Sequence, residues 1–388
     1  MVRSGKELPT KASVVIIGGG VMGVSIAYQL AQSGISDVVL LEKDALGEGS
    51  TCKAAGGVRA QFSDELNIQI GHRSLEVFEN FGKIFDQEID LHQVGYLFLL
   101  DTPDSVEAFE SNVALQNSLG VSTRMISVAE AKKLSPCIST DGLLAAAYSE
   151  RDGHCTPESV VLGYATAARR LGARLITGCE VTDIHTTDDR IVGVETAGGV
   201  IATDTVICVA GAWSKQVGEF VGVDLPVTPV RRQVLVTADV PDLRPSMPFT
   251  IDFSTSYYFH NEGRGLLLGM SDPDETPGFK LARDDAWMPR LGEAIAHRTP
   301  DFADIGIASG WAGLYEMTPD HNALIGEAPD ISRFLYATGF SGHGFLMAPA
   351  VGEIVRDLYL NATPELDVSA LDAGRFVGSE IRPELNIV

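Results

Sequence analysis

The sequence predicts an α/β protein in which a Rossmann-like nucleotide-binding domain, discontinuous along the chain, is joined to a second, β-rich domain that also carries helices. Three observations lead to this prediction. A glycine-rich turn links a buried strand to a helix near the start of the chain. Strand patterns dominate two internal stretches, and a second strand, glycine turn and helix stand near the end.

The first strand, turn and helix form the most informative segment. The apolar run at residues 14–17 predicts a buried strand, and Gly18, Gly20 and Gly23 make a G-x-G-x-x-G turn before a helical pattern. Gly18 allows the tight turn, Gly20 lets the backbone approach a pyrophosphate, and Gly23 lets strand and helix pack closely. The anion would sit on the free N–H groups of the new helix.

A second apolar strand, at residues 38–42, ends in an acid. Glu42 follows Gly23 by about 20 positions, where a carboxylate accepts hydrogen bonds from the ribose hydroxyls of an adenine dinucleotide. A glycine triplet alone would be weak evidence, and an ordinary β-turn-α corner is the alternative. Strand, triplet, helix, strand and terminal acid together predict a dinucleotide site.

Composition limits the class of protein. A chain of 388 residues is too long for one simple core, which predicts two domains. The net charge of −23 argues against nucleic acid and anionic membranes as partners, and indicates a solubilising surface or a high-salt habitat.

Neither targeting nor cysteine signals stand out. Residues 1–11 are polar and no stretch is long and apolar enough to span a membrane, so we expect a cytoplasmic protein without a membrane segment. Five scattered cysteines without C-x-x-C spacing predict neither a disulfide framework nor a metal site.

The remaining elements are expected from periodicity and turn residues. Four short strands are expected to form a β-meander, at residues 174–176, 181–184, 191–194 and 199–202. Further strands are expected at residues 95–100, 205–211, 233–237, 256–260, 265–270 and 335–338. Helices are expected at residues 103–119, 129–134, 156–168, 284–297 and 347–360, and over the apolar positions Leu66, Ile70, Leu75 and Phe78.

This order divides the chain into interleaved pieces. The nucleotide-binding domain is predicted at residues 1–90, 150–222 and 322–388. The substrate-binding domain is predicted to fill the two gaps, at residues 91–149 and 223–321.

Six motifs together resemble one family. They stand at residues 15–23, 41–43, 49–59, 209–214, 318–320 and 339–345. The chain resembles the D-amino-acid oxidase superfamily of FAD-dependent amine oxidoreductases, and within it the group of sarcosine oxidases (including their β subunit), dimethylglycine dehydrogenase, glycine oxidase and dye-linked proline dehydrogenase. The likeness covers nearly the whole chain, and its last two motifs are far more specific than the glycine triplet.

The resemblance implies FAD rather than NAD as the cofactor. It also implies hydride transfer from the carbon beside an amine nitrogen to flavin N5, giving an imine that water hydrolyses. The residues expected to bind FAD are Gly18, Gly20, Val21, Met22, Gly23, Glu42, Lys43, Ser50, Thr51, Lys53, Ala54, Ala55, Gly56, Gly57, Val181, Gly211, Trp213, Gly339, Gly342, His343, Gly344, Phe345 and Leu346.

Arg59 and His343 are two of the four expected catalytic residues. Arg59 falls where monomeric sarcosine oxidases keep an arginine for the substrate carboxylate, and its planar fork suits that group. The alternative is a salt-bridged arginine on the loop surface. His343 opens the last helix, whose N–H groups would face the flavin edge where negative charge gathers, and it either adds a donor or only orders the turn.

Tyr315 and Tyr258 complete this set. Tyr315 matches the family's substrate-side tyrosine. Tyr257, Tyr258 and His260 lie on a strand that would roof the flavin, and alternation lets only one of the two tyrosines face the cavity. Ordinary aromatic packing is the competing interpretation for this strand.

Four departures from the family pattern bear on function. Gly313 stands where monomeric sarcosine oxidase has its flavin-linked cysteine, and Lys53 where dimethylglycine dehydrogenase has a histidine, so we expect non-covalent FAD. Leu346 stands where the family has a lysine that anchors the substrate carboxylate. Leu267 stands where the family has a lysine that promotes the reaction of the flavin with oxygen. A bulkier or more apolar substrate than sarcosine, and an acceptor other than O2, are therefore open.

The expected function is FAD-dependent oxidation of the C–N bond of a secondary or N-methyl amino acid of the sarcosine, dimethylglycine or proline type. Its partners would be a small amine or amino acid and either O2 or another electron acceptor. The alternatives are the flavin subunit of a heteromeric dye-linked dehydrogenase and, from another class, a non-catalytic FAD-binding protein. An NAD-linked dehydrogenase fits the first motif but not residues 339–345.

Overall fold

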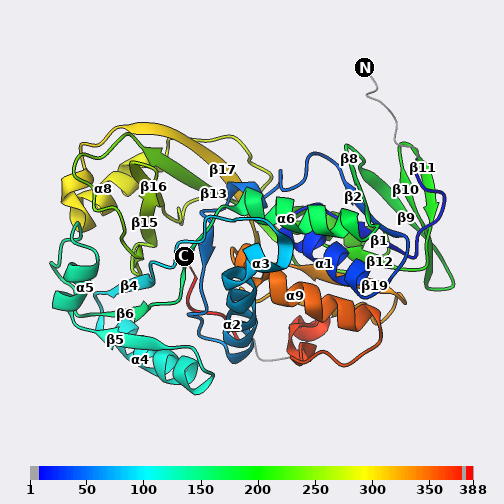
Figure 1. Ribbon diagram of the computed structural model, residues 1–388, viewed down its shortest axis with the longest axis horizontal. Helices are drawn as coiled ribbons and strands as arrows, with labels where there is room; N and C mark the ends of the chain where they lie inside the picture. The colour runs from blue at the N-terminus through cyan, green and yellow to red at the C-terminus, as the bar shows by residue number, and fades with distance from the viewer. Residues whose placement is uncertain (1–7, 378–381, 388) are drawn as a thin grey trace.

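The computed structural model describes residues 8–377 and 382–387. Two lobes lie side by side along the long axis, and each is built on one large sheet (Figure 1). The chain passes between the lobes several times, so that each sheet takes strands from separated parts of the sequence.

The first lobe contains a six-stranded sheet in the order β18-β19-β12-β1-β2-β8. Four of its five pairings are parallel, and the edge pair β18–β19 is antiparallel. The strands are β1 (Val14–Ile17), β2 (Val38–Glu42), β8 (Arg174–Thr177), β12 (Val206–Cys208), β18 (Leu324–Glu327) and β19 (Phe334–Thr338).

Both faces of this sheet are covered, which explains the uninterrupted apolar run of β1. Val14 and Ile16 pack into a core with the helices, whereas Val15 and Ile17 pack into a second core on the opposite face. That second core is closed by a small antiparallel sheet in the order β11-β10-β9. Its strands are β9 (Val181–Thr187), β10 (Arg190–Thr196) and β11 (Gly199–Ala202).

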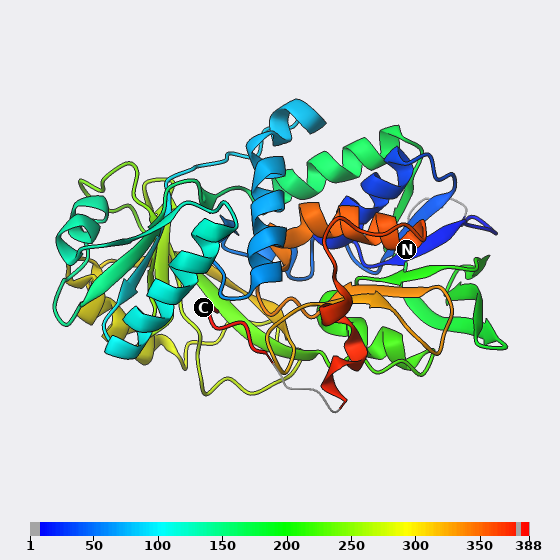
Figure 2. The same ribbon diagram turned by 90° about the horizontal axis from the view of Figure 1, so that it is seen from below.

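Helices form the other layer of the first lobe. α1 packs between α6 and α9, and α2 packs against α9 near the boundary with the second lobe (Figures 1 and 2). These helices are α1 (Val21–Gln32), α2 (Glu65–Glu79), α3 (Phe81–Phe85), α6 (Pro157–Arg170) and α9 (Gly344–Tyr359). The short helix α7 (Ser214–Glu219) lies on the opposite face, where Val217 packs into the second core.

The second lobe contains an eight-stranded sheet in the order β17-β13-β16-β15-β14-β4-β6-β5. Among its pairings only β14–β4 is parallel. The strands are β4 (Tyr96–Leu100), β5 (Thr123–Ile126), β6 (Ala145–Ser149), β13 (Thr228–Thr237), β14 (Phe249–Asp252), β15 (Tyr257–Glu262), β16 (Gly265–Gly269) and β17 (Ile307–Met317).

Strand alternation again separates two layers. Leu97 and Leu99 enter a core with Leu291 of α8, whereas Phe98 and Leu100 join the cluster on the other face. The helices of this lobe are α4 (Pro103–Ser118), α5 (Val128–Leu134) and α8 (Met288–Arg298), and a two-stranded sheet of β3 (Gly57–Val58) and β7 (Gly153–His154) lies beside the loop after β2.

The α/β fold class is confirmed. The six-stranded sheet draws its strands from within the ranges predicted for the nucleotide-binding domain, and the eight-stranded sheet from within the other two. The domain boundaries themselves stay a prediction.

The expectations for several individual elements were wrong or incomplete. Residues 174–177 are not part of the β-meander, because β8 pairs in parallel with β2 at the edge of the main sheet. Strands β5, β6, β14, β17 and β18 were not expected. β17 was hidden because its glycines and polar residues break the alternation, yet it pairs with β13 along its full length.

α9 also begins earlier than expected, at Gly344, so that Pro349 lies inside it. Proline removes a helical N–H and costs stability in isolation. Neighbouring helices hold this turn: Ser25 Oγ of α1 donates to Ala348 O over 2.9 Å and Ser74 Oγ of α2 to Met347 O over 3.2 Å. These bonds do not replace the one lost at Phe345 O, but they fix α9 against α1 and α2.

Candidate active site

A cavity of about 330 Å³ lies where the carboxyl ends of β1, β2 and β12 face the eight-stranded sheet. This volume lies within the range of small-molecule sites, and such sites form at the carboxyl ends of the strands of a parallel sheet. The glycine turn and residues near Glu42 line one end, whereas Arg59, Tyr258, Tyr315 and the start of α9 line the other.

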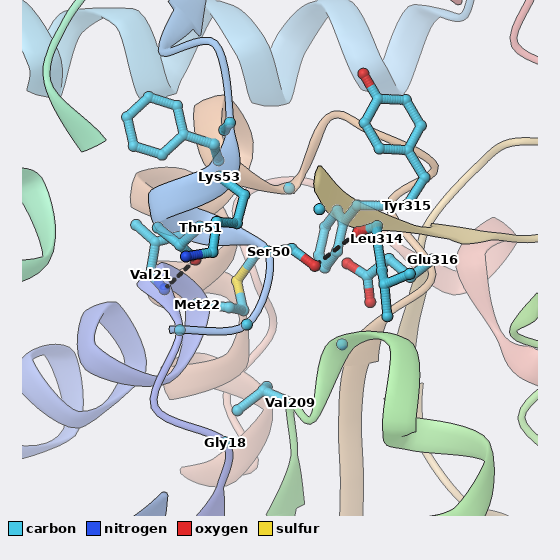
Figure 3. A pocket seen from close by; sticks show the side chains of 18 of the residues that line it. Gly18, Val21, Met22, Ser50, Thr51, Lys53, Val209, Leu314, Tyr315 and Glu316 are labelled. Atoms are coloured by element: carbon cyan, nitrogen blue, oxygen red, sulfur yellow. Dashed lines mark hydrogen bonds between the residues drawn. The ribbon is translucent and has the colours of Figure 1, made fainter. Parts of the chain in front are cut away.

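The glycine turn forms the wall at the first end. Gly18 has a φ of +118°, and a Cβ there would collide with the carbonyl oxygen of Val209. A Cβ on Gly23 would collide with the carbonyl oxygen of Gly18, so this glycine permits the close packing of β1 on α1. Thr51 Oγ1 accepts a hydrogen bond from the N–H of Val21 over 3.1 Å (Figure 3).

Gly20 is different, because the protein alone does not require a glycine there. Its φ is −71°, and a Cβ would meet only Thr51 Oγ1, at 3.2 Å. Open space in front of the helix start, lined by backbone, is what a pyrophosphate needs.

Glu42 at the end of β2 is held by two backbone groups. Gly19 donates to its Oε2 over 2.7 Å and Asp44 to its Oε1 over 2.8 Å. The Lys43 ammonium lies 3.7 Å from the centroid of the Trp213 ring, and Val181 lines the cavity nearby. The carboxylate is therefore fixed at the cavity wall.

The loop after β2 connects the two sheets. Ser50 Oγ donates to Leu314 O over 2.6 Å (Figure 3), and Trp311 Nε1 donates to Lys53 O over 2.9 Å. On the roof strand, His260 Nε2 lies 3.0 Å from Ala55 O. The loop is thus anchored to β17 and β15.

Arg59 and His343 meet at the second end. Arg59 is buried; its Nη2 lies 3.2 Å from His343 Nε2 and donates to Asn386 O over 2.6 Å, and its Nη1 donates to Gln61 O. Burial lowers the pKa of His343 well below 6.5, and the Arg59 charge lowers it further. The lowered pKa favours the neutral ring, and in the tautomer with its proton on Nδ1 the Nε2 atom accepts from Arg59.

Tyr315 and Tyr258 line the same end of the cavity. The Tyr315 ring packs on Gly342, whose φ is +100° and where a Cβ would overlap the ring. Tyr257 points to the opposite face of β15, where its hydroxyl lies 3.0 Å from Thr299 Oγ1. Burial raises the pKa of both cavity tyrosines, so their hydroxyls stay protonated.

Most residues expected to bind the cofactor line this cavity. The exceptions are Gly23 and Gly339, which shape the backbone behind it: Gly339 has a φ of +70° and packs against Thr318. Leu346 lines the cavity, whereas Leu267 does not.

Several lining residues were not identified from the sequence. Among them are Tyr96, Arg232, Phe249, Ile251 and Glu316. Phe249 and Ile251 lie on β14, which was not expected as a strand. For Arg232 the sequence held an incomplete signal: alternation along β13 allows only one of the two adjacent arginines to face the cavity, but it does not decide which one.

Glu316 is buried and accepts a hydrogen bond from Thr338 Oγ1 over 2.9 Å. Burial raises its pKa above the usual range, against the opposing effect of these hydrogen bonds. The hydrogen bonds come from Thr338 and from the backbone of Gly339 and Phe340, so the carboxylate supports the turn before α9.

Comparison with known proteins identifies the family. Residues 13–358 match the family described as FAD dependent oxidoreductase. The chain belongs to the FAD-dependent oxidoreductase family.

Individual relatives in this family are similar over nearly the whole chain. Rat mitochondrial dimethylglycine dehydrogenase is 31% identical over 97% of this chain and 47% of its own length. Human mitochondrial sarcosine dehydrogenase is 31% identical over 96% of this chain and 42% of its own length. The chain therefore spans less than half of each of these curated relatives.

A solved structure agrees more fully in length. L-proline dehydrogenase from P. horikoshii is 33% identical, with a TM-score of 0.91, and the match covers 97% of this chain and 100% of that one.

FAD is the cofactor of the FAD-dependent oxidoreductase family, and the residues present fit it. The open glycine turn, the fixed Glu42 carboxylate and the N-terminus of α9 lie along one cavity. These groups suit a pyrophosphate, a ribose and an electron-rich ring edge, respectively. In the part of the chain that the structure describes, no helix is long and apolar enough to cross a membrane.

Proposed function

We propose that this chain oxidises the C–N bond of a secondary or N-methyl amino acid of the sarcosine, dimethylglycine or proline type. One observation supports this most: two arginines and two tyrosines, Arg59, Arg232, Tyr258 and Tyr315, line the cavity end beside the start of α9. Positive charge beside aromatic walls suits a small apolar molecule with a carboxylate. The named activities of the relatives agree with this class.

FAD would be held by the glycine turn, by Glu42 and by the first turn of α9, and when bound it supplies the hydride acceptor. The N-terminus of α9 carries partial positive charge from its free N–H groups. Gly342 and Gly344 line the cavity with backbone alone, so the turn can approach a ring edge closely at these two positions.

The chain's own residues would orient the substrate and exclude water. The two arginines attract the carboxylate, while Tyr258 and Tyr315 close the walls. His343 is engaged by Arg59, and burial disfavours its protonated form. Glu316 accepts a hydrogen bond from Thr338, and the proposal assigns it no proton transfer. An amine that binds deprotonated needs no protein base, because its lone pair assists loss of the hydride.

The proposal includes non-covalent FAD and a cytoplasmic location. Gly313 offers no side chain for a flavin bond, and Lys53 lies beside it, with its ammonium 3.7 Å from Glu48. Acid precipitation should leave all flavin in the supernatant. Flavin that stays with the pellet would contradict non-covalent binding.

The test is anaerobic bleaching of the flavin absorbance by sarcosine, dimethylglycine, L- and D-proline, glycine and D-alanine. Rapid bleaching by a secondary or N-methyl amino acid supports the proposal, and readmitted air then separates an oxidase from a dehydrogenase. Bleaching by glycine or D-alanine alone would contradict the substrate class. No bleaching by any amine would favour an FAD-binding protein without this chemistry.

A further inference from the structure

Two arginines line the substrate end of the cavity, and their hydrogen bonds differ. A carboxylate binds the guanidinium fork through either its Nη1–Nη2 edge or its Nε–Nη2 edge, and both edges include Nη2. In Arg59, Nη2 already faces His343 Nε2 at 3.2 Å and Asn386 O at 2.6 Å. A substrate carboxylate would have to displace one of these partners.

Arg232 presents the opposite situation. Its Nη1 donates to Arg231 O over 3.0 Å, while its buried Nε has no hydrogen-bond partner within residues 8–377 and 382–387. A buried donor left unpaired is costly, and it is usually explained by a ligand or water. The Nε–Nη2 edge is therefore the open edge.

Strand geometry directs this side chain into the cavity. Arg231, the preceding residue on β13, points the other way and pairs with Glu275 at 2.6 Å and Asp284 at 3.2 Å. Arg232 faces the cavity, and its guanidinium carbon lies 5.3 Å from the centroid of the Tyr315 ring. At this distance the ring attracts the guanidinium, which helps to keep the side chain at the cavity wall.

We propose that Arg232 binds the substrate carboxylate directly, and that Arg59 is a positioning residue that holds His343 and the segment around Asn386. This inference rests on the proposed function, because it presumes an amino acid substrate. Arg232 thereby sets the specificity for an acid over an uncharged amine. The expectation that Arg59 binds the carboxylate is the competing assignment.

A binding experiment tests the assignment without turnover. Cyclopentanecarboxylate has the size of proline but no amine to oxidise, and cyclopentanecarboxamide is its uncharged counterpart. Both are titrated into the flavin-loaded protein, followed by flavin absorbance and calorimetry. The variants are Arg232→Gln, Arg232→Lys, Arg59→Lys and, as a matched charge control, Arg264→Gln, whose side chain is 84% exposed.

We expect the wild type to bind the acid more tightly than the amide. Arg232→Gln should weaken acid binding about tenfold or more and leave amide binding and flavin content unchanged, since a hydrogen bond to a charged group is lost. Arg264→Gln should change neither affinity. Arg232→Lys covers the case in which the glutamine variant does not fold, and should retain only part of the acid preference.

Two results would overturn the proposal, and they differ in meaning. If Arg232→Gln keeps the acid preference while Arg59→Lys loses it, Arg59 is the carboxylate ligand and the proposed function stands. If the wild type binds acid and amide equally, the amino acid substrate class fails, and the role of Arg232 fails with it.

Discussion

Arg59 Nη2 and the backbone carbonyl oxygen of Asn386 form a 2.6 Å hydrogen bond across 327 positions of sequence. Both residues are buried. The bond joins the cavity loop to the segment 382–387, which ends between the two lobes close to α2 (Figure 2). Residues near the end of the described chain thus help to hold a side chain of the candidate site.

Glu384 anchors this segment, and its loss should destabilise the protein. Its carboxylate accepts from Ser63 N at 2.9 Å, Ser63 Oγ at 2.7 Å, Asp64 N at 3.1 Å and Asn67 Nδ2 at 3.0 Å. Glu384→Ala leaves these donors unpaired, so we expect a loss of about 2–4 kcal/mol, measured by urea unfolding. The exposed Glu365→Ala is the control, and equal unfolding midpoints for the two variants would refute this anchor role.

Gly20 and Gly23 should separate cofactor binding from folding. Gly20→Ala adds a Cβ whose nearest neighbour is Thr51 Oγ1 at 3.2 Å, so the flavin-free protein should keep its melting temperature while flavin occupancy falls. Gly23→Ala forces a Cβ into the Gly18 carbonyl oxygen and should lower the melting temperature of the flavin-free protein itself. Full flavin occupancy in Gly20→Ala would argue against a pyrophosphate at this turn.

The stability contributed by His154 should depend on pH. Burial, with His260 and His92 nearby, lowers its pKa from 6.5 to about 2, and its ring stacks on His260 with centroids 4.1 Å apart. Below pH 6.5 this histidine is protonated in the unfolded chain but stays neutral in the folded protein. The free energy of unfolding that His154 contributes therefore falls as the pH drops through 6.5.

The free energy of unfolding of the wild type minus that of His154→Asn should therefore decrease by about 1.4 kcal/mol per pH unit below 6.5. Urea unfolding between pH 7.5 and 5 measures this slope, and the exposed His297→Asn serves as control. Equal slopes for both variants would mean that His154 is not held neutral by the fold.

Arg298 and Asp252 form a buried ion pair in the second lobe. Arg298 Nε lies 2.6 Å from Asp252 Oδ2, and Nη1 donates to Ser139 O over 2.9 Å. Arg298→Met leaves the carboxylate without its cation, and we expect a loss of about 3–5 kcal/mol. Adding Asp252→Leu should recover part of it, and a double variant less stable than Arg298→Met would contradict this explanation.

Much of the candidate site could be predicted because its motifs are local. The turn at Gly18, Gly20 and Gly23 needs glycine for short-range reasons, and the order strand, turn, helix is visible in sequence. The roof strand was predictable to the same extent: alternation allowed only one of Tyr257 and Tyr258 in the cavity, and Tyr258 is the one that lines it.

Other features depend on distant pairing. β17 has no clear alternation of its own and is stabilised by β13, and β8 joins β2 rather than the strands that follow it. The placement of Arg232 could not be decided without knowing which face of β13 lies against the cavity, because Arg231 stands beside it with the same charge.

By itself the sequence determined the α/β class, the glycine turn with Glu42, and the family that these motifs indicate, since each depends on spacing within a short segment. The tertiary structure decided which side chains share the cavity and which donors are already used. In Arg59 the Nη2 group is already bonded to Asn386 and His343, whereas among the described residues the Nε of Arg232 has no partner. Hydrogen-bond partners that lie hundreds of positions apart are set by tertiary packing.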